Sequence, residues 1–204
     1  MLVKVNKDKP DKDIIKKAVE ILNKGGILVA PTETAYGFIC DATNFQAIYK
    51  VYSIKRREKN KYLPLAVASL IQLQNFFELN EKELELVGKY PCISIVLKPR
   101  IGAQKYDVHL VENQKNCAVR VSTNNLIKNL AKKLGRPLTA SSANLAGGGV
   151  CYSVPDIKKQ IGDLENKVDM ILDGGALAIK KPSTIVKVRG DKIKVLRHGE
   201  TEIL

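Results

Sequence analysis

The chain has 204 residues, of which 45% are hydrophobic and 27% charged, a composition that allows a buried core without disulfide or metal staples. Its 34 Lys and Arg residues against 21 Asp and Glu residues leave a formal net charge of +13. This excess favours a polyanionic ligand, and it does not choose between RNA and ATP because both carry phosphates. A general lysine bias would produce the same excess.

The sequence gives little support for a membrane protein, a metal-binding protein or a disulfide-stabilised protein. The apolar stretches at residues 27–30 and 63–68 are too short to cross a bilayer, so we expect a cytoplasmic protein without membrane contact. No C-x-x-C pair links the cysteines, and the two histidines lie far apart, so no metal ligand is predicted. The cysteines are expected to be core thiols in a reducing compartment. The residues concerned are Cys40, Cys92, Cys117, Cys151, His109 and His198.

In the first half, helical and strand patterns alternate. Residues 11–24 have apolar side chains at helical spacing and end at Gly25-Gly26, a natural C-cap. A short strand follows at 27–30. Thr43 and Gln46 suggest a capping box for a helix over 47–55, and Asn80 with Glu83 caps a helix over 81–89. We also expect a strand at 65–68, a helix at 71–77 and a strand at 93–97.

The second half continues the alternation. Strands are predicted at 117–121, 138–140, 168–172, 184–188 and 192–196, and helices at 124–134 and 155–161. The last two strands are joined at residues 189–191 and suggest a hairpin. Residues 141–150 are expected to be a glycine-rich loop, and residues 102–116 an exposed loop. The prediction is one α/β domain over residues 1–204, with a mixed sheet and flanking helices.

Three polar clusters could carry chemistry. Residues 31–37, Pro-Thr-Glu-Thr-Ala-Tyr-Gly, directly follow a strand, where hydroxyls and a carboxylate can hold an amino acid or a nucleotide. Lys55 and Arg57 lie two positions apart at a helix end and can converge on a triphosphate. Ser142 and Asn144 precede three glycines whose N–H groups can form an anion-binding nest. Each cluster alone also fits a plain turn, a solvated helix end or a flexible connector.

Together and in this order, the clusters resemble the TsaC/YrdC family of threonylcarbamoyl-AMP synthases, in its short, single-domain branch. The close matches are P-T-E-T-x-Y-G at 31–37, K-x-R at Lys55 and Arg57, and S-x-N at Ser142 and Asn144. Weaker matches are residues 119–121, 173–175 and 182–186, and the closing Arg197-x-Gly199. Residues 90–94, Tyr-Pro-Cys-Ile-Ser, depart from the family's Pro-Gly-Pro-x-Thr and retain only Pro91 and a hydroxyl at Ser94.

The resemblance implies an open, twisted α/β sheet and a nucleotidyltransferase. The enzyme would make threonylcarbamoyl-adenylate and pyrophosphate from L-threonine, bicarbonate or CO2, and ATP, with Mg²⁺ accompanying ATP. Partner proteins would then transfer the threonylcarbamoyl group to an adenosine in tRNA, and tRNA or double-stranded RNA is a further candidate partner. The alternatives are an RNA- or ribosome-binding module of the same fold without this catalysis, and a paralogous carbamoyl- or adenylyl-transfer enzyme.

On the resemblance, the predicted catalytic residues are Lys55, Arg57, Ser142 and Asn144. Lys55 and Arg57 would hold the triphosphate, and Ser142 with Asn144 would fix the nucleotide and the carbamate. Threonine and its carboxylate, or a phosphate, would be bound by a second set: Thr32, Thr34, Tyr36, Arg120, Ser183 and Arg197.

Overall fold

The computed structural model describes residues 1–102, 108, 115–190 and 192–203, and its strands form two sheets. The first sheet has the order β1 (Leu2–Lys4), β10 (Met170–Asp173), β2 (Leu28–Pro31), β3 (Tyr36–Ile39), β9 (Ser141–Ser142). The second has the order β12 (Lys192–Arg197), β11 (Ile185–Arg189), β6 (Ser94–Pro99), β7 (Cys117–Val121), β4 (Leu65–Val67), β8 (Leu138–Thr139), and β5 (Phe77–Glu78) pairs with β6.

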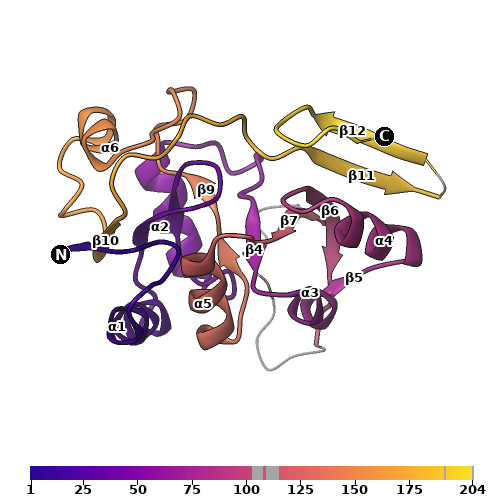
Figure 1. The fold of residues 1–204 in the computed structure, drawn as a ribbon, viewed down its shortest axis with the longest axis horizontal. Helices are drawn as coiled ribbons and strands as arrows, with labels where there is room; N and C mark the ends of the chain where they lie inside the picture. The colour runs from indigo at the N-terminus through magenta and orange to yellow at the C-terminus, as the bar shows by residue number, and fades with distance from the viewer. Residues whose placement is uncertain (103–107, 109–114, 191, 204) are drawn as a thin grey trace.

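Both sheets are mixed, as predicted. In the first, β1, β10 and β2 are parallel, whereas β3 and β9 are antiparallel to their neighbours. In the second, β4 is parallel to β7 and β11 to β6, whereas β6 is antiparallel to β7. The predicted hairpin is present as the antiparallel pair β11–β12. Figure 1 shows the elements in two groups, α1, α2, α6 and β10 on one side and α3, α4, β6, β11 and β12 on the other.

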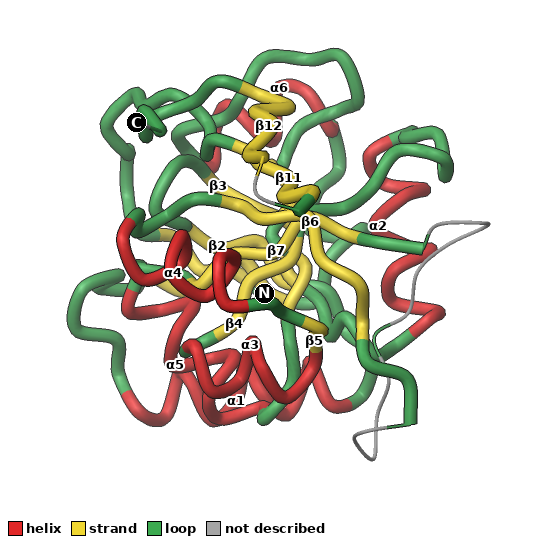
Figure 2. The backbone as a smooth tube through the Cα atoms, turned by 90° about the vertical axis from the view of Figure 1, so that its right-hand side faces the viewer, coloured by secondary structure: helices red, strands yellow, loops and turns green. Residues whose placement is uncertain are grey.

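In the described part of the chain, six helices flank the sheets: α1 (Lys12–Asn23), α2 (Phe45–Lys55), α3 (Leu70–Phe76), α4 (Glu81–Lys89), α5 (Asn125–Leu134) and α6 (Val154–Ile161). Figure 2 shows α1, α3 and α5 on one side of the strands and α6 on the other. Alternate residues of β2 serve the two faces of the first sheet: Leu28 packs with α1 and α5, and Val29 packs with α2 and α6. A third apolar cluster fills the space between the second sheet and helices α3 and α4.

Local sequence signals explain most helix ends. The side chain of Asp11 accepts hydrogen bonds from the first turn of α1, and Asn80 and Glu83 form the predicted capping box of α4. Gly135 ends α5 at φ 74°, a conformation that favours glycine. The predicted cap of α2 is wrong, because Asn44 accepts from the N–H of Ala47. The hydroxyl of Thr43 instead donates to Asp41 at 2.7 Å.

Several short strands were missed. Residues 36–39 were assigned to no element and form β3, and Ser141 and Ser142, predicted to begin a loop, form β9. Strand β3 forms an antiparallel hairpin with β2, and β9 is defined by its pairing with β3, in which Gly37 pairs with Ser142 and Phe38 with Ser141. Most of the loop predicted at 102–116, His109, and the hairpin residue Asp191 lie outside the described residues.

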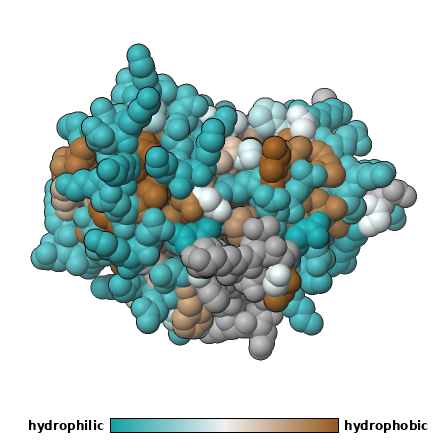
Figure 3. Space-filling view, turned by 90° about the horizontal axis from the view of Figure 1, so that it is seen from below, coloured by the Kyte–Doolittle hydropathy of each residue, from teal (hydrophilic) through white to brown (hydrophobic). Residues whose placement is uncertain are grey.

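The described surface fits the charged composition. On the face shown in Figure 3, hydrophilic residues dominate and apolar residues form separate small patches. All four cysteines are free, and all but Cys92 are buried. Among the described residues, no helix combines the length and the hydropathy needed to span a bilayer.

Candidate active site

The two sheets meet along residues 138–142, which pass from the second sheet into the first. Thr139 pairs with Leu65 in β4, and three residues later Ser142 pairs with Gly37 in β3. Between them, the N–H of Ala140 donates to the carbonyl of Pro64 at 2.7 Å. This crossing brings the three polar clusters of the sequence to one place.

The 31–37 cluster is shaped by a tight turn and a close approach. Thr32 donates from both its N–H (2.9 Å) and its hydroxyl (2.7 Å) to the carbonyl of Ala35, which closes the turn between β2 and β3. A Cβ at Gly37 would lie 3.2 Å from the carbonyl oxygen of Ser141 and equally close to Thr32. Glycine therefore lets β3 pair closely with β9, with Gly37 opposite Ser142.

A cavity of about 220 Å³ lies at this crossing. No acidic side chain from the described part of the chain lines it. Four cationic side chains and four hydroxyls do: Arg57, Arg120, Lys180, Arg197, Thr34, Ser141, Ser142 and Ser183. This lining suits a ligand that carries several negative charges.

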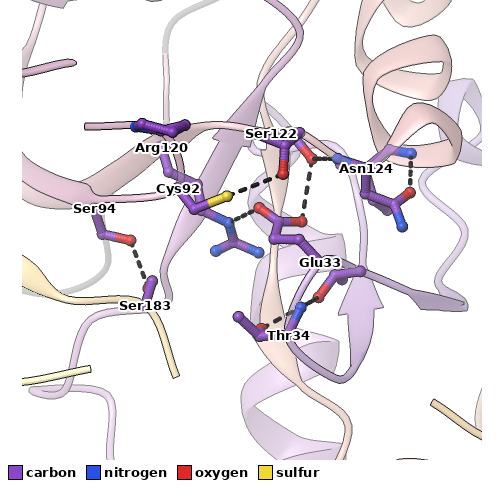
Figure 4. A network of polar contacts seen from close by, with 12 residues as sticks. Glu33, Thr34, Cys92, Ser94, Arg120, Ser122, Asn124 and Ser183 are labelled. Carbon is purple, nitrogen blue, oxygen red and sulfur yellow. Dashed lines mark hydrogen bonds and ion pairs between the residues drawn. The ribbon is translucent and has the colours of Figure 1, made fainter. Parts of the chain in front are cut away.

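Arg120, on β7, is held from behind by Glu33. Its Nε lies 2.5 Å from Glu33 Oε1, the other carboxylate oxygen accepts from Ser122 Oγ at 3.2 Å, and only 4% and 7% of the two charged side chains are exposed (Figure 4). Burial alone would raise the pKa of Glu33, but the charge and hydrogen bond of Arg120 hold that pKa below its ordinary value. Glu33 is therefore an ionised, buried anchor for Arg120.

Arg197, at the end of β12, also lines the cavity and is held by Ser183. Its Nε (3.0 Å) and Nη2 (2.7 Å) donate to the carbonyl of Ser183, and Nη2 also reaches Ser183 Oγ at 3.1 Å. The Ser183 hydroxyl lies 2.9 Å from that of Ser94, the residue that survives in the altered 90–94 stretch. Burial lowers the pKa of Arg197, and the nearby charge of Arg120 lowers it further.

Lys55, the last residue of α2, is buried with 2% of its surface exposed. Its ammonium donates to the carbonyl of Ser142, to the carbonyl of Asn144 at 2.8 Å, and to Asn144 Oδ1 at 3.2 Å. Burial, together with the charge of Arg57, lowers the pKa of Lys55 to about 7. We define Lys55, Ser142 and Asn144 as the lysine clamp, which joins the end of α2 to the start of the glycine-rich loop.

Both polar atoms of the Asn144 side chain have hydrogen-bond partners within the protein. Oδ1 accepts from Ser142 Oγ at 2.6 Å, and Nδ2 donates to the carbonyl of Gly148 at 2.7 Å. Asn144 therefore fixes the glycine-rich loop. Of the clamp residues, only Ser142 lines the cavity.

Other predicted site residues divide into two groups. Arg57 and Thr34 line the cavity, and the guanidinium of Arg57 is steadied by the carbonyls of Lys61 and Tyr62. Thr32 and Tyr36 do not line it. The buried hydroxyl of Tyr36 donates to the carbonyl of Gly175 at 2.7 Å and accepts from the N–H of Gly174, and burial raises its pKa. A substrate-binding role for Thr32 or Tyr36 stays a prediction.

Sequence reasoning missed two charged residues of this region. Glu33 stands inside the 31–37 motif, and its proximity to Arg120, 87 positions away, appears only in the fold. Lys180 lines the cavity from the long segment between β10 and β11, and no local pattern sets it apart from Lys181.

Comparison with curated proteins gives relatives along nearly the whole chain. A protein from Methanocaldococcus jannaschii is 32% identical over 190 residues, which cover 90% of this chain and 86% of that protein. A threonylcarbamoyl-AMP synthase from Vibrio vulnificus is 30% identical over 189 residues, covering 91% and 98%.

Solved structures agree on the fold. Escherichia coli YciO superposes with a TM-score of 0.84 at 27% identity, covering 99% of this chain and 97% of that one. Pyrococcus abyssi Sua5 in complex with L-threonine superposes with a TM-score of 0.85 at 24% identity, and the present chain spans 57% of its length. Residues 20–199 match the Sua5–YciO–YrdC family, described as telomere recombination. The chain belongs to the Sua5–YciO–YrdC family.

Proposed function

We propose that this protein is an L-threonylcarbamoyl-AMP synthase. It would join L-threonine, bicarbonate or CO2, and ATP into threonylcarbamoyl-adenylate and pyrophosphate, for threonylcarbamoyladenosine modification of tRNA. Relatives at about 30% identity over nine-tenths of the chain support this class of reaction. The observation that carries the proposal is the cavity at the crossing of the two sheets, where four cationic side chains meet four hydroxyls.

The chemistry fits this lining. An oxygen of the threonine carbamate attacks the α-phosphorus of ATP, and the bond from that phosphorus to the bridging oxygen breaks as pyrophosphate leaves. Such a step needs positioned substrates and positive charge around the departing group more than a protein nucleophile. In our proposal Arg57 and Arg197 contact the phosphates, and Arg120 binds the threonine carboxylate.

The hydroxyls and the lysine clamp would have positioning roles. Thr34, Ser142 and Ser183 line the cavity and would hydrogen-bond the substrates. Lys55 and Asn144 act through Ser142, because both hold the turn that carries it. A wrongly placed Ser142 would separate the carbamate from the α-phosphate.

Binding of Mg²⁺ would depend on the nucleotide. The described residues contain no group of three or more His, Cys, Asp or Glu side chains that could hold a metal ion, and the polar side chains that line the cavity are cationic or hydroxyl-bearing. These residues do not build a cage for Mg²⁺, which would have to be held by phosphate oxygens and water.

Pyrophosphate release tests the proposal. The purified protein should release pyrophosphate from ATP only when L-threonine and bicarbonate are both present, and mass spectrometry should identify the adenylate. Release that ignores threonine would contradict the assignment. RNA binding without turnover, weakening steeply with salt, would favour the RNA- or ribosome-binding alternative.

Two adjacent arginines provide a matched pair of variants. Arg57 lines the cavity, whereas its neighbour Arg56 is exposed, is not among the lining residues and has a left-handed backbone with φ 48°. Arg57→Ala should lower kcat/KM for ATP by about tenfold to a hundredfold, the value of a lost hydrogen bond to a charged group. Arg56→Ala should stay near wild type. Equal losses would refute a phosphate contact specific to Arg57.

Transfer to tRNA lies downstream of this reaction. We propose that partner proteins carry the threonylcarbamoyl group to the tRNA adenosine. Adding purified transfer proteins and tRNA to the adenylate-forming reaction should then yield modified tRNA, and product formed with tRNA alone would contradict a need for partners.

A further inference from the structure

Two cavities lie on either side of the turn between β2 and β3. The second cavity, of about 270 Å³, shares Thr34 and Lys180 with the first. Glu33 lines the second cavity and Arg120 lines the first, so the Glu33–Arg120 ion pair forms part of the wall between them. Glu33 is therefore not placed to touch a ligand in the first cavity.

The pair leaves one side of the guanidinium available. Arg120 meets Glu33 through Nε, and in the described part of the chain its two Nη atoms make no hydrogen bond (Figure 4). Neither Nη atom is an enclosed, unsatisfied group, so both reach open space. A carboxylate docked there would receive the two parallel N–H bonds that a guanidinium offers.

Charge separates Arg120 from the other cations of the cavity. Arg57, Lys180 and Arg197 have no acidic partner among the ion pairs of the described residues, whereas Arg120 is neutralised by a buried carboxylate. A pyrophosphate group gains most where positive charge is uncompensated, and a net-neutral amino acid gains little from it. At Arg120, ligand preference therefore depends mainly on hydrogen-bonding geometry. At Arg57, Lys180 and Arg197, it depends mainly on net charge.

We propose that Glu33 determines specificity in the first cavity: by neutralising Arg120 from the second cavity, it reserves that guanidinium for an amino acid carboxylate and disfavours phosphate there. Glu33 is a positioning residue that acts through Arg120. This inference rests on the proposed function for the identity of the two ligands, and it concerns where each of them binds.

The test removes the charge of Glu33 while keeping the shape of its side chain. Glu33→Gln retains an oxygen that can accept from Arg120 Nε and removes the negative charge. In the wild type, pyrophosphate should compete with ATP alone. In Glu33→Gln it should compete with threonine as well, and calorimetry should show the ratio of pyrophosphate to threonine affinity rising by about tenfold, the effect of one uncompensated charge at short range in a partly hydrated site.

Two further variants separate charge from shape. Glu33→Asp keeps the charge and shortens the side chain, so its affinity ratio should stay within about threefold of wild type if charge decides. In the double variant Glu33→Gln/Arg120→Gln, which leaves no unpaired buried charge, threonine binding should be lost while pyrophosphate still binds through Arg57 and Arg197. The double variant carries the test if Glu33→Gln alone does not fold.

The outcomes are distinct. An unchanged affinity ratio and inhibition pattern in folded Glu33→Gln would overturn the inference, as would loss of pyrophosphate binding in the double variant. A Glu33→Asp protein as altered as Glu33→Gln would show that shape, and not charge, decides. Wild-type protein that binds both ligands with the expected pattern but forms no adenylate would sink the proposed function and leave the inference standing.

Discussion

Two buried cations of this protein are used in opposite ways. The ammonium of Lys55 is occupied by three oxygens of the lysine clamp, whereas Arg120 is anchored through Nε and presents its Nη atoms to the cavity. Both residues lie in motifs typical of the family, and their burial is similar. The difference lies in the partners. Three oxygens hold the ammonium of Lys55 in a structural role, whereas the single carboxylate of Glu33 leaves the Nη atoms of Arg120 to act as the carboxylate receptor that we propose.

The largest expected effect comes from removing the receptor. Arg120→Ala should lower threonine-dependent pyrophosphate release by on the order of a thousandfold, because a buried anchor for the substrate carboxylate is lost. It should also destabilise the protein by about 3–5 kcal/mol, since Glu33 is left as an unpaired buried charge. Steady-state kinetics and urea unfolding measure the two effects.

Arg136 provides the control for that experiment. It pairs with Asp41 at 3.0 Å, and only 12% and 5% of the two charged side chains are exposed, but it does not line the cavity. Arg136→Ala should lose comparable stability and keep its threonine KM. A similar kinetic loss in both variants would mean that Arg120 matters only for folding.

Breaking the lysine clamp should have a smaller effect on turnover and a clear effect on stability. Lys55→Met keeps the length of the side chain but removes the ammonium donor from the carbonyls of Ser142 and Asn144, of which the Ser142 carbonyl keeps the N–H of Asn144 at 3.0 Å. We expect a loss of about 2–4 kcal/mol and a fall of about a hundredfold in kcat as Ser142 is misplaced. Lys50→Met, at an exposed position of the same helix, should change neither. A stable but inactive Lys55→Met protein would instead favour direct contact of Lys55 with substrate.

The smallest expected effect is the share of the pH dependence of stability that Lys55 contributes. Its pKa is about 7 in the folded protein against an ordinary 10.5, so between these values the unfolded chain holds one proton more. The free energy of unfolding should therefore rise with pH across this window, by at most about 1.4 kcal/mol per unit. Comparing urea unfolding of wild type and Lys55→Met from pH 6 to 9 isolates this contribution. A constant difference between the two proteins would contradict the lowered pKa.

Local sequence predicted those parts of the fold that depend on neighbouring residues. The capping box of Asn80 and Glu83 joins residues three positions apart, and it is present as predicted. Thr43 does not cap α2, because its hydroxyl donates to Asp41, which is paired with Arg136. Asn44 caps the helix instead. Strand β9 was missed because its partner β3 lies more than 100 positions away, whereas β3 also pairs with the nearby β2 across a tight turn.

The sequence by itself determined the alternation of helices and strands and the order of three polar clusters, because apolar spacing and motif residues are local properties of the chain. Only the folded chain shows which of those residues line the cavity. The strand crossing at residues 138–142 joins the two sheets, ties Lys55 to carbonyls, and leaves Arg120 open to the cavity with Glu33 behind it. A side chain's partner, and with it the use of its charge, is set by residues distant in sequence that only the folded chain brings within hydrogen-bonding distance.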